Sequence, residues 1–270
     1  MSKIHVAFLW HMHQPNYRDP VRGTYSMPWV RLHGTKAYND MILLAERFPE
    51  MRLTFNLVPS LLEQLEDYAS GAEDYELLLS RKAPECLTTE EKKALLARFF
   101  WANADTMIKP YPRYYELLQY RGTRGTRAEI ENAATRFSTQ DFLDLQVFFN
   151  LSWFGFTARE SDPEIRRLIR KGRLFSIEER DMVLDRQLQI IAGLIPVYRR
   201  AWEGNIVDIT ASAFYHPILP LLCDTSIARE GMPGCLRPQG RLRRPEDAAA
   251  QTRMSMEYFQ KRFGRKPEGM

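Results

Sequence analysis

The stretch Arg52–Ala69, RLTFNLVPSLLEQLEDYA, decides the fold. Its first seven residues alternate in part between apolar and polar, which predicts a β-strand over Arg52–Val58. The chain then turns at once into PSLLEQLEDYA, whose apolar residues recur at helical spacing: Leu61, Leu62, Leu65 and Tyr68. Because a strand that leads directly into a helix is half of a βαβ unit, the stretch favours an α/β fold.

The residues before this stretch repeat the same pattern. A short, nearly continuous apolar run predicts a buried strand over Ile4–Trp10, and a loop follows over residues 11–33. A helix is predicted from near Gly34 until Pro49 stops it. Strand, helix, strand and helix in succession predict parallel strands with right-handed crossovers.

The residues after it change character. We expect helices and almost no strands over residues 72–203, with capping boxes at Thr88/Glu91 and Ser176/Glu179 and a weaker one at Ser138/Asp141. Four prolines are expected to break or bend these helices: Pro110, Pro112, Pro163 and Pro196. Strand character returns over Gly204–Thr210, and a last helix runs from Pro245 to Gly264. The pattern predicts a barrel-like α/β fold interrupted by a large helical insertion.

Composition limits the class of protein. The 270 residues are 44% hydrophobic and 27% charged, which is typical of a globular chain with a substantial core. The net charge of +4 comes from dispersed basic residues without interleaved aromatic platforms, so we expect no nucleic-acid partner. Cys86, Cys223 and Cys235 form no CxxC pair, which suits a reducing compartment. With no signal peptide and no apolar run of about 18 residues, we expect a cytoplasmic protein without a membrane partner.

Polar and aromatic side chains gather where the predicted strands end, which is the functional edge of an α/β barrel. They are Trp10, His11, His13 and Gln14 after the first strand, Asn56 on the second, and Asp208, Thr210, Tyr215 and His216 on or after the third. In an extended chain, His11 and His13 would point the same way, about 6.6 Å apart.

Three interpretations of the two histidines are open. Imidazoles at one barrel edge can share a divalent ion, but such sites need further ligands, and only His5, His33 and His216 remain in the chain. The histidines can also be satisfied structural groups at a strand end. Tryptophan, histidine, glutamine and asparagine together suit a neutral sugar, because rings stack on its apolar faces and neutral groups bind its hydroxyls. We favour the sugar site.

Two further features allow both a binding and a structural role. The stretch PWVRLHGTKAYND, Pro28–Asp40, places Trp29, Arg31, His33 and Lys36 at a loop-to-helix junction, either as part of a site or to fix the loop to the core. Asp208 interrupts an apolar strand, where a buried carboxylate is costly without partners. It either binds a ligand or makes a structural hydrogen bond.

Six segments together resemble glycoside hydrolase family 57, in its amylopullulanase-like branch: WHMHQPNYRDP, PWVRLHGTKAY, TFNLVPSLLEQLEDY, DLQVFFNLSWFG, GNIVDIT and YHPILPLLCD. The resemblance implies a distorted (β/α)7, TIM-like barrel with helical additions. It implies a retaining enzyme that acts on α-glucans or maltooligosaccharides, with no cofactor and no catalytic metal. The choice between hydrolase and transferase, between α-1,4 and α-1,6 bonds, and the oligomeric state stay open.

The resemblance also implies roles for residues. His11 and His13 fall in the first family signature and would bind the sugar, with Trp10 bordering them. The second signature, around GNIVDIT, commonly carries an acidic residue, which falls on Val207 or Asp208 depending on the end from which it is counted. We prefer Asp208, as a substrate-binding carboxylate. His216 would approach from the next loop.

The family's catalytic residues have no counterpart here. The lead-in to the nucleophile motif is present as FGRKPEGM, after which the sequence stops at Met270. Retaining hydrolysis needs two carboxyl groups roughly 5 to 5.5 Å apart, and the family's glutamate nucleophile and aspartate acid/base are expected beyond Met270. We therefore expect residues 1–270 to be the N-terminal segment of one catalytic domain, inactive by itself. The alternatives are a non-catalytic carbohydrate-binding fragment and a metal-dependent hydrolase using His11 and His13.

Overall fold

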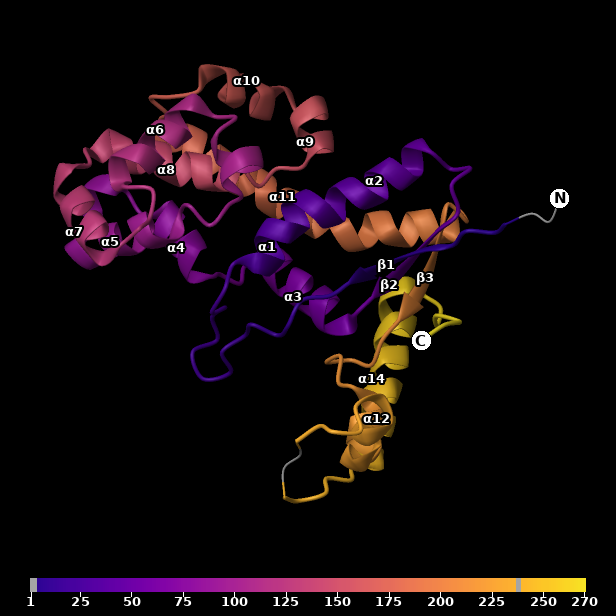
Figure 1. The fold of residues 1–270 in the computed structure, drawn as a ribbon. Helices are drawn as coiled ribbons and strands as arrows, with labels where there is room; N and C mark the ends of the chain where they lie inside the picture. The colour runs from indigo at the N-terminus through magenta and orange to yellow at the C-terminus, as the bar shows by residue number, and fades with distance from the viewer. Residues whose placement is uncertain (1–3, 237–238) are drawn as a thin grey trace. The chain divides into compact units, whose positions relative to one another are not determined.

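The computed structural model describes residues 4–236 and 239–270. It divides into two compact units. Figure 1 shows the helices and strands in chain order by colour. The sheet unit comprises the described residues of Met1–Asn16, Ala45–Gln64 and Ile195–Met270. The helical unit comprises Tyr17–Leu44 and Leu65–Leu194.

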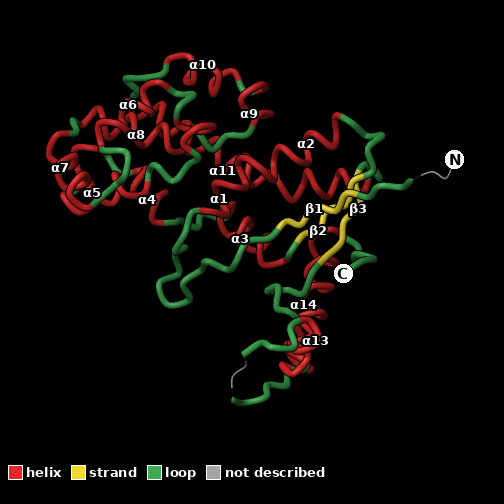
Figure 2. The backbone as a smooth tube through the Cα atoms, in the orientation of Figure 1, coloured by secondary structure: helices red, strands yellow, loops and turns green. Residues whose placement is uncertain are grey.

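The sheet unit contains the three predicted strands. They are β1 (Phe8–Met12), β2 (Leu53–Leu57) and β3 (Val207–Ala211). β2 lies within its predicted range, whereas β1 and β3 lie slightly further along the chain than predicted. Both neighbouring pairs are parallel, in the order β1-β2-β3, which confirms the predicted strand direction (Figure 2, yellow). The register places His11 beside Asn56, and Asn56 beside Thr210.

The prediction that the first strand is buried is wrong. Phe8, Leu9 and Trp10 keep 49%, 62% and 43% of their surface exposed, and only Met12 of β1 is buried. The reason is position, since β1 lies at one edge of the described sheet and has only β2 beside it. An apolar run by itself does not say whether a strand is central or at an edge.

Helices complete the sheet unit and connect it with the rest of the chain. Its own short helices are α12 (Leu219–Cys223), the 3₁₀ turn η4 (Thr225–Ile227) and α13 (Ala228–Gly231), followed by α14 (Pro245–Phe263). The predicted stop of α14 is confirmed, because Gly264 adopts a left-handed φ of 76° that favours glycine. Three helices have residues in both units: α2 (Asn39–Arg47), α3 (Pro59–Ala69) and α11 (Ile177–Glu203).

The helical unit confirms the prediction of helices without strands over residues 72–203. Its elements are α1 (Trp29–His33), the π-helix η1 (Gly34–Tyr38), α4 (Tyr75–Arg81), η2 (Pro84–Cys86), α5 (Thr89–Arg98), η3 (Ala104–Ile108), α6 (Pro112–Arg121), α7 (Arg127–Arg136), α8 (Thr139–Leu151), α9 (Phe156–Ser161) and α10 (Pro163–Lys171). All three predicted capping boxes form their reciprocal hydrogen bonds. Pro196 does not end α11, which continues through it.

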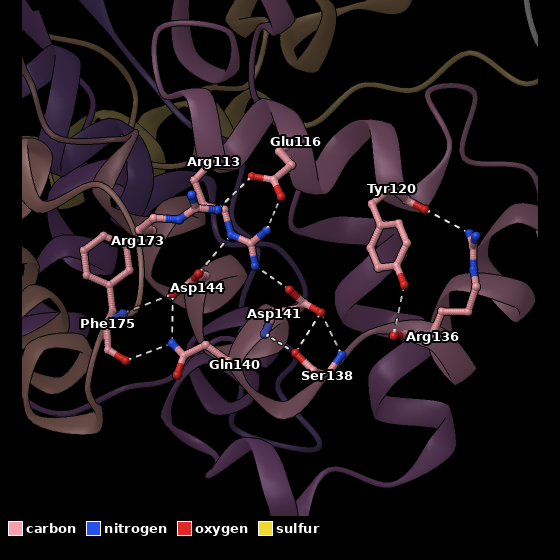
Figure 3. Close-up of polar contacts among 10 residues, drawn as sticks. All are labelled: Arg113, Glu116, Tyr120, Arg136, Ser138, Gln140, Asp141, Asp144, Arg173 and Phe175. Carbon is pink, nitrogen blue, oxygen red and sulfur yellow. Dashed lines mark hydrogen bonds and ion pairs between the residues drawn. The ribbon is translucent and has the colours of Figure 1, made fainter.

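Buried charges fix the helices of this unit to one another. The carboxylate of Asp144 on α8 is inaccessible and accepts hydrogen bonds from Arg113 Nε on α6 at 3.0 Å and from the backbone N–H of Phe175 at 3.1 Å (Figure 3). Arg113 also pairs with Asp141, at the start of α8. One guanidinium thus joins two helices, and Asp144 ties both to the segment that precedes α11.

Arg31 is a second buried cross-link. Its side chain is inaccessible, pairs with Asp74 at 2.8 Å, and donates hydrogen bonds to Asn150 at 2.8 Å and Gln187 at 2.7 Å. These contacts join α1 to the N-cap of α4, to α8 and to α11. The sequence allowed either a binding or a structural role for the charged residues of Pro28–Asp40, and Arg31 has a structural role.

Candidate functional site

The carboxyl ends of the three strands meet around the side chain of Asn56, as the parallel sheet dictates. Asn56 is 7% exposed, and its amide nitrogen donates to the Thr210 hydroxyl at 3.1 Å and to the Ala211 carbonyl at 2.8 Å. Its amide oxygen accepts from the Ser212 hydroxyl at 2.9 Å and faces His11 Nδ1 at 2.8 Å. The side chain of Asn56 is therefore fully occupied by protein groups and orients its neighbours.

This network fixes the tautomer of His11. Because the amide nitrogen of Asn56 is committed to Thr210 and Ala211, its oxygen is the atom that faces His11, and Nδ1 must carry the proton. The lone pair of the neutral ring then lies on Nε2. His11 is exposed, so this atom can accept a hydrogen bond from a ligand hydroxyl.

Three imidazole rings gather at this edge. The ring centroids lie 5.8 Å apart for His11 and His13, 4.8 Å for His11 and His216, and 4.3 Å for His13 and His216, whose rings stack. His216 adopts a left-handed φ of 55°, which is costly for a residue with a side chain and often marks a functional position. We call His11, His13 and His216 the histidine cluster.

Two members of the cluster, His13 and His216, favour the neutral form. Burial, followed by the proximity of His216 and His11, lowers the pKa of His13 to about 4. Burial and the proximity of His11 also lower the pKa of His216. A neutral imidazole has one hydrogen-bond donor and one acceptor, which matches the hydroxyl groups of an uncharged sugar.

The loop after β1 is fixed close to the cluster. Gln64 on α3 donates to the Pro15 carbonyl at 3.0 Å, next to Gln14, which lies half-buried in the loop beside His13. Trp10 lies one residue before His11 and in register with Phe55. Because side chains alternate along a strand, its ring projects from the face opposite to His11, so the structure does not bring Trp10 to the face that carries the histidine cluster.

Asp208 lies at the other end of the strands. It lines a cavity of about 430 Å³ together with Arg52, Arg265 and Lys266, and its carboxylate accepts the backbone N–H of Ile209 at 2.9 Å. The side chain is exposed, so the expected cost of a buried carboxylate does not arise. The structure brings Asn56 and His216 to His11 and His13, and it places Asp208 elsewhere.

Trp29 and His33 belong to the helical unit, where they form a group with two further tryptophans. Trp29 stacks on Trp101 with centroids 5.6 Å apart and lies 6.0 Å from Trp153, against whose edge His33 packs at 5.1 Å. Burial, followed by the charge of Lys36, lowers the pKa of His33. We call Trp29, His33, Trp101 and Trp153 the tryptophan group.

Sequence reasoning missed several participants. Ser212 stands in the Asn56 network beside Thr210, which was predicted, and it follows the same predicted strand, which was a usable signal. Trp101 and Trp153 are two of only five tryptophans, but no local pattern placed them beside Trp29. Among residues 4–236 and 239–270, no three His, Cys, Asp or Glu side chains are grouped so as to hold a metal ion. No helix in the described ranges is long and apolar enough to cross a membrane.

Comparison with known proteins gives distant structural matches. A family 57 branching enzyme from Thermococcus kodakaraensis, solved with glucose, matches with 16% identity and a TM-score of 0.40, over 97% of this chain and 32% of that one. The α-amylase AmyC from Thermotoga maritima matches with 13% identity and a TM-score of 0.43, over 97% and 34%. A family 57-type branching enzyme from Pyrococcus horikoshii matches with 19% identity and a TM-score of 0.43, over 97% and 33%. The chain spans about a third of the length of these structures.

No protein of curated function matches the chain. The family model for glycosyl hydrolase family 57, by contrast, matches residues 7–270, nearly the whole sequence. The matched range contains all three strands, the histidine cluster and the tryptophan group. The chain therefore belongs to glycosyl hydrolase family 57.

Proposed function

We propose that this chain forms the sugar-binding part of a retaining, α-glucan-active glycoside hydrolase or glucanotransferase of the amylopullulanase-like branch, acting in the cytoplasm. The observation that carries the proposal is the hydrogen bond between Asn56 and His11, which orients one ring of the histidine cluster at the carboxyl edge of the sheet. Family membership supports the reaction class.

The proposed role of the cluster is non-covalent. His11 Nε2 would accept a hydrogen bond from a sugar hydroxyl, and the stacked pair of His13 and His216 would provide neutral donors and acceptors beside it. Retaining hydrolysis also needs a nucleophile and an acid/base about 5 to 5.5 Å apart. We assign neither role to a residue of this chain. The described residues would position the sugar for carboxylates supplied by other parts of the enzyme.

Calorimetry with maltoheptaose tests the proposal on the chain as it stands. We expect binding by the wild-type chain, and binding at least about tenfold weaker in the His11→Ala variant, because a positioning hydrogen bond is lost. The matched control is His5→Ala, which removes an exposed histidine that precedes β1. Binding without release of reducing sugar supports a binding role for this chain. Equal affinity in the wild type and His11→Ala would contradict the proposed site.

A further inference from the structure

The helical unit contains a cavity with an unusual set of charges. Its volume is about 410 Å³, and it lies where the segment between η3 and α6 meets α9 and α10. Three arginines and three apolar or aromatic residues line it: Arg159, Arg166, Arg170, Pro110, Tyr111 and Ile169. The cavity therefore has a largely apolar wall, and three arginines contribute to its lining.

These arginines lack the carboxylate partners that neighbouring arginines have. Arg167, on the same helix as Arg166 and Arg170, pairs with Glu164 and with Glu179 at 2.9 and 2.8 Å. Within residues 4–236 and 239–270, no salt bridge joins any of the three cavity arginines to an acidic side chain. Three arginines that form no salt bridge therefore line one cavity, an arrangement that attracts an anion.

Arg159 is the most constrained of the three. Its Nη2 donates to the Ser152 carbonyl at 2.9 Å, and the guanidinium lies beside the rings of Tyr111 and Phe156, 5.8 and 5.9 Å from their centroids. Its Nε is buried and has no hydrogen-bond partner in the described part of the chain. A buried donor without an acceptor is rare and costly in a native protein, and a bound anion would satisfy it.

The surroundings reinforce the positive character of this region. Burial and the charge of Arg159 lower the pKa of Lys36, whose ammonium lies 5.8 Å from the Phe156 ring. Asp40, the nearest acidic influence on Lys36, is itself occupied by the backbone N–H groups of Phe156 and Thr157 at the start of α9. Burial raises the pKa of Tyr111, so its hydroxyl stays protonated and can donate.

We propose that this cavity binds an organic phosphate, with the phosphate group on Arg159, Arg166 and Arg170 and the attached ring against Tyr111 and Ile169. The planar guanidinium fork matches two phosphate oxygens at once, which a lysine cannot do. The apolar wall favours a ring-bearing phosphate over inorganic phosphate. This site would be additional to the histidine cluster and does not depend on the function proposed for that cluster.

Titration of the full chain with three probes tests the proposal: glucose 1-phosphate, AMP and inorganic phosphate, with unphosphorylated glucose as a blank. The test variant is R166Q/R170Q, because both side chains are exposed on α10 and their replacement leaves the core intact. We expect this variant to bind the organic phosphate at least about tenfold more weakly, through the loss of charge-assisted hydrogen bonds. The matched control R167Q removes a paired arginine from the same helix and should change the affinity less than about twofold.

Each result has a defined meaning. Tighter binding of glucose 1-phosphate than of AMP identifies a sugar phosphate as the ligand, and the reverse order identifies a nucleotide. Either result supports the site if R166Q/R170Q weakens that binding and R167Q does not. Equal losses in R167Q and the double variant would overturn the proposal, because they would show a general effect of charge. If inorganic phosphate binds as tightly as both organic phosphates, the proposed contact of the ligand ring with Tyr111 and Ile169 is wrong. A dissociation constant above about 10 mM for all three probes would overturn the site itself.

Discussion

His13 belongs to the proposed sugar site, where its ring stacks on His216 and lies 5.8 Å from His11. In an active enzyme that contains this chain, we expect His13→Ala to lower activity on soluble starch at least about tenfold, because a substrate-positioning contact is lost. Initial rates of reducing-sugar release measure this for a hydrolase, and iodine staining measures it for a transferase. The control is His5→Ala, which should retain wild-type rates. Unchanged activity in His13→Ala would remove His13 from the site.

The pH dependence of stability reports on the same residue. The folded pKa of His13 is about 4, below the 6.5 of an unperturbed histidine, so the unfolded chain binds this proton more readily. The contribution of His13 to stability is therefore complete above pH 6.5 and is lost as the pH falls towards 4. We expect the free energy of unfolding, measured with urea at several pH values, to fall less over this range in His13→Gln than in the wild type. Identical slopes for both proteins would argue against the low pKa.

The sequence allowed the members of the histidine cluster to be predicted, but not their geometry. His11, His13, Asn56 and His216 all follow or end predicted parallel strands, and such strand ends meet at one edge. The tautomer of His11 depends on how Asn56 bonds to Thr210 and Ala211, which are 154 and 155 residues away from it in the sequence. No local pattern contains this information. Asp208 was predicted from its place in an apolar strand and from a family signature, and the sheet places it in a cavity at the opposite ends of the strands.

At the scale of elements, Asn56 ties the ends of all three strands together. Its buried amide makes hydrogen bonds to His11, Thr210, Ala211 and Ser212. We expect Asn56→Ala to lower the free energy of unfolding by about 2–4 kcal/mol, since four hydrogen bonds of a buried side chain are lost at once. Urea denaturation measures this. The variant should also lose sugar affinity, because His11 is no longer oriented; a stability loss without any affinity loss would make Asn56 purely structural.

The helices depend on Arg31 in a comparable way. Replacing one member of a buried ion pair leaves the other charge unpaired, so we expect Arg31→Met to destabilise the chain by about 3–5 kcal/mol. Thermal and urea unfolding measure the loss. The exposed pair of Arg127 and Glu131 on α7 provides the control, because Arg127→Met should cost less than about 1 kcal/mol. Similar losses in the two variants would show that burial of the pair is unimportant.

Local signals predicted the elements well, whereas long-range contacts were not predictable. The capping boxes at Thr88, Ser138 and Ser176 each involve residues three positions apart, so the sequence alone contains them. The N-terminus of α9 is satisfied by Asp40, which is 116 residues away from Phe156, and no local motif indicates this contact. The π-helical turn over Gly34–Tyr38 was likewise not predicted. There, a side chain on Gly34 would come within 3.2 Å of Leu65, so glycine allows close packing.

At the scale of the whole molecule, the described sheet has an open edge. β1 pairs only with β2 among the described strands, and its free side presents backbone groups beside the exposed side chains of Phe8, Leu9 and Trp10. Unpaired apolar edge strands bind other strands readily, and proteins usually protect them with charge or with a cover. No charged residue lies within Phe8–Trp10 to provide such protection. The 270-residue chain by itself should therefore associate with other copies through β1.

A lysine on this edge should prevent the association. Leu9 is 62% exposed in the middle of the apolar segment, so Leu9→Lys adds a charge without disturbing a buried contact. Sedimentation velocity over a range of protein concentrations should show oligomers for the wild type and a larger monomer fraction for Leu9→Lys. Val21→Lys is the matched control, because Val21 is 91% exposed and belongs to the helical unit, not to a strand. If both lysine variants reduce association equally, net charge rather than the β1 edge controls it. If the wild type is monomeric at all concentrations, the β1 edge does not drive association and the prediction is wrong.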